Sequence, residues 1–277
     1  MRLPPWHTQF DVWLLLGGIW VGYFLLARRH RSRTGERTSR RQETFFCLGM
    51  LALWTGADWP IHDLAEGYLY SMHMVQHMLF SWVAPPLLIA GMPVWFLRVV
   101  LKPRPVRGLV RFLTRPVMAL VVFNAILLFT HWPAVVDLSV RSQLVHFGLH
   151  LLLFSSSLVM WWPVMSPLPE MPLLAPPAQM LYLFLQSLAP TIPASFLAFG
   201  SKVLYPAYAT FPRIWGIGPL TDQLIAGLIM KIGGGLILWG FIATIFFRWH
   251  AREERDGLDA LQYGNVDRDL RARLMKP

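Results

Sequence analysis

The sequence is dominated by long apolar runs, each about as long as a helix that crosses a lipid bilayer. A crossing takes roughly 20 apolar residues, because a helix rises about 1.5 Å per residue through about 30 Å of hydrocarbon. The runs of this kind cover about residues 11–27, 44–59, 68–101, 116–136, 142–165, 178–200 and 221–247. They predict an all-α fold: a polytopic bundle of about seven transmembrane helices, forming a single domain over residues 1–250.

Composition supports a membrane protein over a soluble one. Only 14% of the 277 residues are charged and 55% are hydrophobic, whereas soluble domains carry about 25% charged residues. The single cysteine, Cys47, excludes a disulfide framework and any CxxC metal or redox site. Trp161 and Trp162, near the end of the fifth run, are expected in the aromatic belt at the membrane interface.

The third run is longer than one crossing needs and contains Pro85, Pro86 and Pro93. Neighbouring helices can satisfy the carbonyl groups that proline leaves free in a membrane. We therefore expect one kinked crossing, with two half-crossings as the alternative.

The basic residues cluster beside the apolar runs and set the expected orientation. Segments 28–41, 98–115 and 248–277 hold 20 of the 25 Lys and Arg residues. With seven crossings these segments share one side, which the positive-inside rule makes cytoplasmic. The N-terminus is then outside, and residues 251–277 form a charged cytoplasmic tail. Basic clusters so placed indicate contact with anionic membrane lipid, so the net charge of +10 does not indicate a nucleic-acid partner.

Five histidines fall at the predicted outer end of three runs, where their imidazoles could share a metal ion. They are His73, His77, His131, His146 and His150. Two pairs are spaced i, i+4, which places each pair on one face of its helix. Ionisable residues inside spans are costly and usually functional. The pattern predicts a metal site with His77 and His150 facing each other, and with His73, His131 and His146 nearer the outside. His62 lies in an outer loop and is expected to be dispensable.

Methionines near the histidines favour copper as the metal. Met74 and Met78 form a second i, i+4 stripe, and Met230 lies at a similar depth in the last run. Thioether beside imidazole is a soft ligand set that points to Cu(I). Asp137 and Asp222 lie at the same end and could hold imidazole N–H groups as outer-shell acceptors.

Lys231 conflicts with a cation site in the same helix. We expect its charge to be buried near the site, where it would repel a metal ion unless Asp222 or another acid paired with it.

Other interpretations of the histidines remain open. HxxxH pairs arise by chance in helices, and methionine stripes commonly fill apolar surface. A zinc-dependent hydrolase would need three nitrogen ligands and an acid–base carboxylate, supplied here by Asp137 or Asp222. A bis-histidine haem protein would take its axial ligands from two facing helices. A structural partner with a vestigial site is a further alternative, and a homo-oligomer is possible.

Four separated segments resemble a known family. MHMVQHMLFSWVAPPLLIAGMPV, THWPAVVD, HFGLHLLLFSSSLVMWWPV and DQLIAGLIMKIGGG resemble, in this order, the CtaG-type cytochrome c oxidase assembly factors. The resemblance covers roughly residues 45–250. It implies a multi-pass protein of the bacterial cytoplasmic (inner) membrane that supplies copper to haem-copper oxidase on the outer face.

The resemblance also implies partners and a mode of action. The motif histidines, Asp222 and Met230 correspond to positions of the family's motifs, whereas an apolar or aromatic residue would be expected in place of Lys231. The partners would be oxidase subunits or copper carrier proteins. We therefore predict a copper-binding assembly factor that transfers metal and is not an enzyme.

Overall fold

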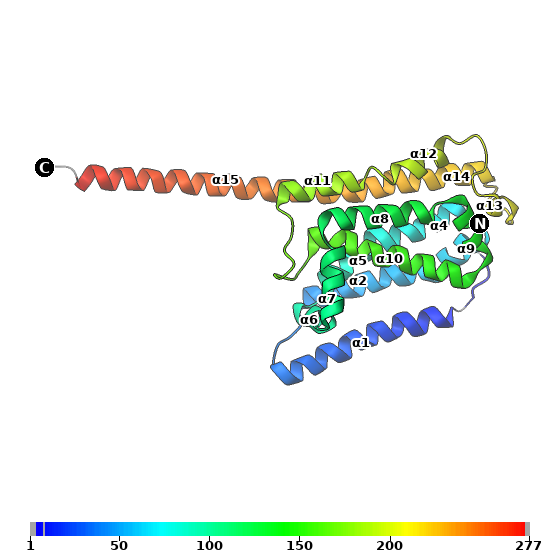
Figure 1. The fold of residues 1–277 in the computed structure, drawn as a ribbon, viewed down its shortest axis with the longest axis horizontal. Coiled ribbons are helices and arrows are strands. Elements are labelled where there is room, and N and C mark those ends of the chain that lie inside the picture. The colour runs from blue at the N-terminus through cyan, green and yellow to red at the C-terminus, as the bar shows by residue number, and fades with distance from the viewer. Residues whose placement is uncertain (1–3, 8, 275–277) are drawn as a thin grey trace.

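The computed structural model describes residues 4–7 and 9–274, and all secondary structure in this part of the chain is helical. Figure 1 shows the long helices lying side by side along one axis. In chain order they are α1 (Phe10–Thr34), α2 (Arg40–Ala57), α4 (Tyr70–Met78) with α5 (Ala84–Gly91), α8 (Pro116–Thr130), α10 (Gln143–Met165), α11 (Pro176–Gln186) with α12 (Thr191–Phe199), and α14 (Pro219–Leu228) with α15 (Gly234–Leu274).

Short helices connect the long ones at both ends of the bundle. At the end where the chain begins they are α3 (Ile61–Gly67), α9 (Pro133–Arg141) and α13 (Pro206–Thr210); at the opposite end they are α6 (Val94–Val100) and α7 (Arg104–Leu113). The three basic segments lie at this opposite end: the end of α1 with the loop after it, helices α6 and α7, and the projecting part of α15 (Figure 1). The structure thus separates the basic clusters from the histidine motifs along the bundle axis.

Five helical segments are long and apolar enough to cross a membrane by themselves: Phe10–Thr34, Tyr70–Gly91, Gln143–Met165, Pro176–Phe199 and Pro219–Asp256. A sixth is obtained if α7 and α8, which meet at an angle of 80°, are taken together. Helix α2 lies alongside these segments (Figure 1) but has three charged residues, Arg40, Arg41 and Glu43, within its 18 residues. The structure confirms an all-helical membrane protein, while the number of seven crossings and the orientation of the termini stay predictions.

Several expected runs differ from the helices in the structure. The helix in the run 68–101 ends at Gly91, and the separate helix α6 begins at Val94 after its extended N-cap residue, Pro93. The run 116–136 is divided after Thr130, and the run 178–200 is interrupted between Gln186 and Thr191. In the last run α15 continues through residue 250 to Leu274, so the predicted domain boundary marks a change in composition within one helix.

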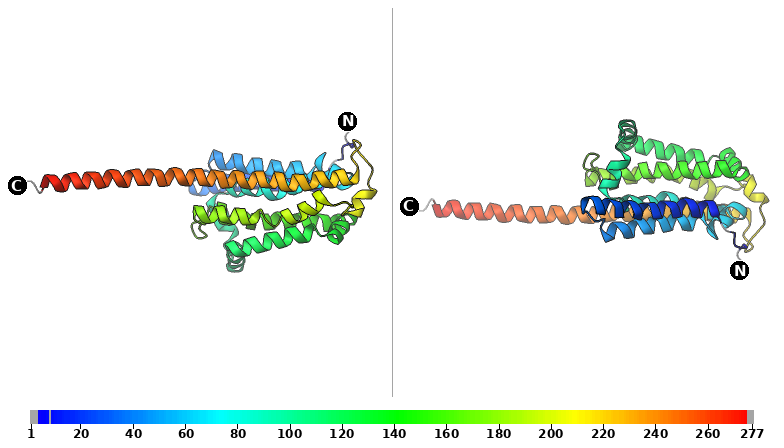
Figure 2. Two further views of the ribbon diagram at one scale, coloured as in Figure 1. Left: turned by 90° about the horizontal axis from the view of Figure 1, so that it is seen from above. Right: turned by 90° about the horizontal axis from the view of Figure 1, so that it is seen from below.

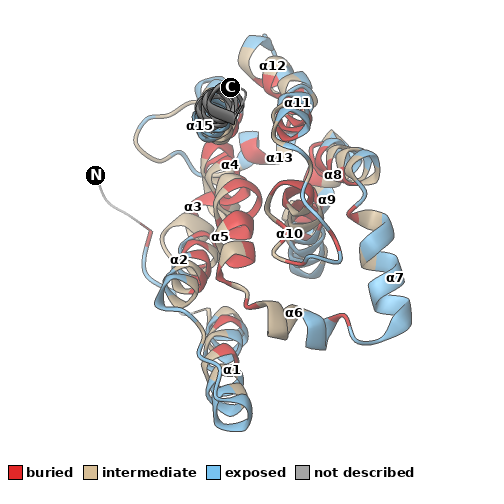
Figure 3. Ribbon diagram, turned by 90° about the vertical axis from the view of Figure 1, so that its left-hand side faces the viewer, coloured by how far each residue is buried: buried red, intermediate tan, exposed pale blue. Residues whose placement is uncertain are grey.

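Viewed along the bundle axis, the helices form two rows (Figure 3). One row contains α1, α2, α4 with α5, and α15; the other contains α10, α8 and α11 (Figures 2 and 3). Buried residues concentrate where α4, α5, α8 and α10 face one another, whereas α1 is largely exposed (Figure 3). Large apolar side chains such as Leu14, Leu144 and Leu236 are exposed on the outside, as expected for a surface that faces lipid.

The third span is one helical segment, Tyr70–Gly91, with an irregular turn where its prolines remove backbone donors. Residues Leu79–Val83 are π-helical, immediately before Pro85 and Pro86. Pro85 has no N–H to offer the carbonyl four residues earlier, and this carbonyl, on Ser81, accepts the indole N–H of Trp161 at 2.9 Å. Trp161 is therefore fully buried in the bundle, and its expected place in the interfacial belt was wrong.

Glycine allows α5 to pack closely against α2. A Cβ atom on Gly91 would lie 2.4 Å from the backbone nitrogen of Phe46, and one on Gly49 would lie 2.7 Å from Leu88 Cγ. The Gly91 carbonyl also accepts a hydrogen bond of 2.9 Å from the hydroxyl of Tyr23 on α1. This contact fixes the central α4–α5 span, which carries the first histidine pair.

Candidate metal centre

The five predicted histidines form one cluster between the two rows of helices. Ring centroids lie 4.4 Å apart for His73 and His77, 4.2 Å for His146 and His150, and 5.3 Å for His77 and His150. His73 lies 5.3 Å from His150, and His131 lies 5.1 Å from His77. The pairs from α4 and α10 thus face each other as predicted, and all five residues are at least 90% buried except His150, which is partly buried.

The helix carrying His73 and His77 is held at its start by another span. The two carboxylate oxygens of Asp222 accept the backbone N–H groups of Tyr70 at 2.7 Å and Ser71 at 2.9 Å. These N–H groups belong to the first turn of α4, where a helix has no internal acceptors. Asp222 therefore caps α4 from α14 and fixes the height of both histidines.

His131 lies at the C-terminal end of α8, and one of its ring nitrogens is hydrogen-bonded to the backbone. Its Nδ1 lies 2.7 Å from the Leu127 carbonyl oxygen. A carbonyl only accepts, so Nδ1 carries the proton and Nε2 keeps a free lone pair. The His131 carbonyl in turn accepts the hydroxyl of Tyr205 at 2.9 Å. A backbone-held imidazole with a free second nitrogen is the arrangement found in metal-ligating histidines.

Each histidine of the cluster has a buried ring nitrogen without a hydrogen-bond partner among the described residues. These atoms are His73 Nδ1, His77 Nδ1, His131 Nε2, His146 Nε2 and His150 Nε2. Buried polar atoms in folded proteins are nearly always partnered. One ligand nitrogen from each of His73, His146 and His150 lies within 4.8 Å of the others. Next to them is a small cavity of about 10 Å³. It has room for one small ion or one water molecule.

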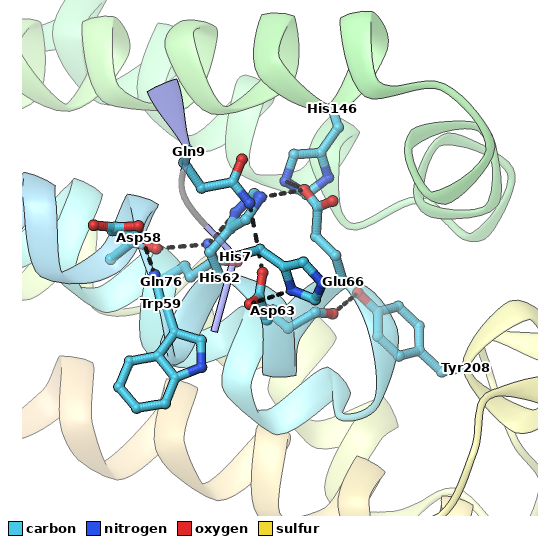
Figure 4. A network of polar contacts seen from close by, with 12 residues as sticks. His7, Gln9, Asp58, Trp59, His62, Asp63, Glu66, Gln76, His146 and Tyr208 are labelled. Carbon is cyan, nitrogen blue, oxygen red and sulfur yellow. Dashed lines mark hydrogen bonds and ion pairs between the residues drawn. The ribbon is translucent and has the colours of Figure 1, made fainter. Parts of the chain in front are cut away.

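Glu66 and His62, on α3, extend the cluster toward the end of the bundle (Figure 4). Glu66 Oε1 lies 2.9 Å from His146 Nε2 and 3.5 Å from His62 Nε2, and the three residues form a second possible ligand group. This contact is not an aligned hydrogen bond, and it is an ion pair only when His146 is protonated. Burial raises the pKa of Glu66, but His146 and His62 outweigh it and keep this pKa below its usual value.

Sequence reasoning missed Glu66 and set His62 aside. The i, i+4 spacing of these two residues in the loop DWPIHDLAEG was the available signal. Their contribution depends on how α3 folds back: the Tyr208 hydroxyl donates to the Ala65 carbonyl at 3.0 Å, and the Gln76 amide approaches His62 Nδ1 at 3.4 Å.

Two cavities reach the cluster from different directions. A polar cavity of about 130 Å³, lined by Glu66, His146, Tyr208 and Arg141 among others, lies at the end of the bundle. A mainly apolar cavity of about 210 Å³ lies between α1, α2 and α10 and also contacts Glu66 and His146. The first is lined mostly by polar residues, and the second mostly by apolar side chains, many of them from α1 and α10.

The predicted methionine ligands lie on a different side of α4. Met74 and Met230 are buried in the main apolar core, with Met78 packed against it. The sulfur of Met78 lies 3.7 Å from where a Cβ on Gly233 would be, beside the last span. Successive helical residues are rotated by about 100°, so the sulfur stripe faces α14 while the histidine stripe faces α10. Methionine coordination stays a prediction.

The charged residues near the site differ from expectation. Asp222 uses its oxygens on the α4 backbone and not on an imidazole. Asp137, on α9, has a buried Oδ1 without a partner among the described residues. Lys231 is exposed, and its Nζ donates to Thr191 Oγ1 at 2.6 Å. Within the described part of the chain it is paired with neither Asp222 nor another acid, and the expectation that its charge is buried near the site was wrong.

The sequence model of the cytochrome c oxidase caa3 assembly factor family (Caa3_CtaG) matches residues 21–252. This match covers most of the chain and every residue of the histidine cluster. The chain belongs to the Caa3_CtaG family. No curated protein and no solved structure matches the chain. The predicted resemblance is thereby confirmed, and it identifies this membrane protein as an assembly factor for cytochrome c oxidase.

Proposed function

We propose that this Caa3_CtaG protein binds Cu(I) at the histidine cluster and passes it to a haem-copper oxidase subunit or copper carrier. Copper is then cargo, and the protein itself catalyses no chemical conversion. The histidine end would face the extracytoplasmic side of the bacterial cytoplasmic membrane, following the positive-inside rule for the basic segments at the other end.

The observation that supports a metal site most strongly is a set of four buried imidazole nitrogens without partners among the described residues, on His73, His77, His131 and His150. Without a ligand, each would lose hydrogen bonds to water and gain none. A metal ion removes this cost by accepting their lone pairs. Neutral imidazole suits copper, zinc, iron and nickel, and the assembly of a copper-containing oxidase favours copper among them.

The close packing of the histidines disfavours the haem alternative. Neighbouring ring centroids lie 4.2–5.6 Å apart, and the cavity beside them, of about 10 Å³, has room for about one water molecule. A porphyrin between two axial histidines needs far more space. The cluster offers more nitrogens than one ion needs, which favours stepwise ligand exchange. Copper would then move between neighbouring sets such as His77 with His131 and His146 with His150.

The experiment is a Cu(I) titration of purified protein against a chromogenic competing chelator. Replacing His73 or His150 by Ala should weaken Cu(I) binding by at least about 10–100-fold. Replacing a residue that only hydrogen-bonds to a metal ligand already causes a loss of this size. His7→Ala is the matched control, because its imidazole is exposed and its described contact, of 3.4 Å, is with Asp63 and not with a residue of the cluster. X-ray absorption of the copper-loaded protein would count nitrogen and sulfur ligands and test the methionines.

Unchanged affinity in both cluster variants would overturn the copper site. The role in assembly is tested separately: cells lacking the protein should contain oxidase polypeptide with low activity, partly restored by added copper. Full oxidase activity in copper-limited deletion cells would contradict that role.

A zinc-dependent hydrolase is the second candidate, because the structure places a carboxylate beside three histidines. His73, His146 and His150 converge within 4.8 Å, and Glu66 approaches His146 at 2.9 Å. Three nitrogen ligands with a neighbouring general base are what such an enzyme needs. Zinc retained through purification, with hydrolysis lost in Glu66→Gln, would favour this candidate over copper transfer.

Orientation is tested with reporter fusions. A fusion at Arg40 should report a cytoplasmic position and a fusion at Glu66 an extracytoplasmic one. A cytoplasmic Glu66 would invert the topology and place the cluster on the wrong face for oxidase copper.

A further inference from the structure

The last span carries a lysine in the middle of its apolar stretch. Lys231 lies twelve residues after Pro219, the start of the span Pro219–Asp256, which is about 18 Å along the helix axis. The next basic residue along this helix, Arg248, lies another 17 positions on. The ammonium group therefore lies deep in the apolar stretch, where charged side chains are costly and usually functional.

Lys231 borders a cavity of about 390 Å³ that is separate from the histidine cluster. The cavity is lined mainly by the interrupted α11–α12 span and by the last span, with Trp82 of the third span at its wall. Among the described residues, no acidic side chain lines it, and Lys231 carries the only formal charge on its wall. Among the described hydrogen bonds of the ammonium group, one of 2.6 Å goes to Thr191 Oγ1, so two of its three N–H donors are available.

Local backbone irregularities on three sides create this space. The last span is π-helical over Ile229–Gly233, and α11 ends at Gln186 before α12 begins at Thr191. On the third side Trp82 lies in the π-helical turn of its own span, and a Cβ on Gly234 would lie 3.8 Å from its indole nitrogen. Such π-helical turns inside longer helices occur frequently at functional sites.

We propose that this cavity binds a long-chain carboxylate that enters from the bilayer. The Lys231 ammonium would pair with the carboxylate, and the apolar walls formed by Met230, Leu238 and Trp239 would contact the chain. The volume favours this ligand over one acidic side chain from another protein, because a single Asp or Glu side chain would leave most of about 390 Å³ unfilled. The proposal does not depend on copper binding at the histidine cluster.

The test uses the full-length protein in nanodiscs with a diazirine-bearing C16 fatty acid and its methyl ester as probes. After photolysis, the acid should label peptides containing residues 187–191 and 230–239. The uncharged ester should label these peptides at least about 10-fold less, because it cannot form the charge-assisted hydrogen bond. Lys231→Met should lower labelling by the acid to the level of the ester, whereas Lys231→Arg should retain most of it.

Lys202→Met is the matched control, because Lys202 is exposed in the loop after α12, and it should label like the unaltered protein. Equal labelling by acid and ester, or undiminished labelling of Lys231→Met, would overturn the proposal. If Lys231→Met fails to fold, the comparison of acid with ester on the unaltered protein still tests whether the cavity prefers a carboxylate.

Discussion

Replacement of Asp222 by Ala tests whether this carboxylate holds the first histidine helix in place. Asp222 is 1% exposed and accepts two backbone N–H groups of α4, from Tyr70 and Ser71. Hydrogen bonds to charged groups contribute about 1.5–3 kcal/mol each, so two give about 3–6 kcal/mol. Replacing an exposed helix-capping residue by Ala lowers the free energy of unfolding by about 0.5–2 kcal/mol. We expect a loss of about 3–5 kcal/mol here, because the alanine leaves two buried donors without an acceptor.

The assay is equilibrium unfolding in mixed micelles of dodecyl maltoside and SDS, followed by tryptophan fluorescence. A loss of 3 kcal/mol corresponds to about a 100-fold change in the unfolding equilibrium. Hydrogen exchange of the Tyr70 and Ser71 amides should accelerate as well. Asp137→Ala is the control, because Asp137 Oδ1 has no described partner, and it should change stability by less than about 1 kcal/mol. Equal stability of the two variants would refute the capping argument.

Two further pairs of variants test the packing around the central span. Gly91→Ala should destabilise by about 1–3 kcal/mol in the same unfolding assay, because a Cβ there would lie 2.4 Å from a backbone atom of α2, whereas Gly17→Ala, with nothing within 4 Å, should be nearly neutral. Trp161→Phe should cost about 1–3 kcal/mol by leaving the Ser81 carbonyl unpaired. Trp162→Phe should cost less, since its indole nitrogen has no described partner, and equal costs for both would contradict the role given to the Trp161 bond.

The sequence by itself determined the features that depend on helical periodicity. The apolar runs predicted an all-helical membrane protein, and the i, i+4 spacing placed His73 with His77, and His146 with His150, on single helix faces. These predictions succeeded because rise and rotation per residue are nearly constant in a helix. Motif order was enough to predict the family, which the match over residues 21–252 confirms.

Tertiary structure alone decided which groups complete the cluster. Glu66 reaches His146 only because α3 folds back over the end of the bundle, and Asp222 reaches α4 only because α14 packs beside it. Such contacts join residues 80 to 152 positions apart, and no local spacing encodes them. The same holds for Trp161, whose burial depends on a carbonyl that Pro85 leaves free in another helix.

The rotation of each helix about its own axis was the other quantity that local patterns could not supply. Methionine and histidine stripes share α4, and either could have faced α10. Packing turned the histidines toward α10 and the methionines toward the apolar core. Burying Met74 and Met230 among apolar side chains leaves no polar atom without a partner, while the imidazoles gather on the side where the other histidines and Glu66 lie. The sequence thus determined that ligand-type side chains lie at one end of a helical bundle, and the packing of helices decided which of them meet.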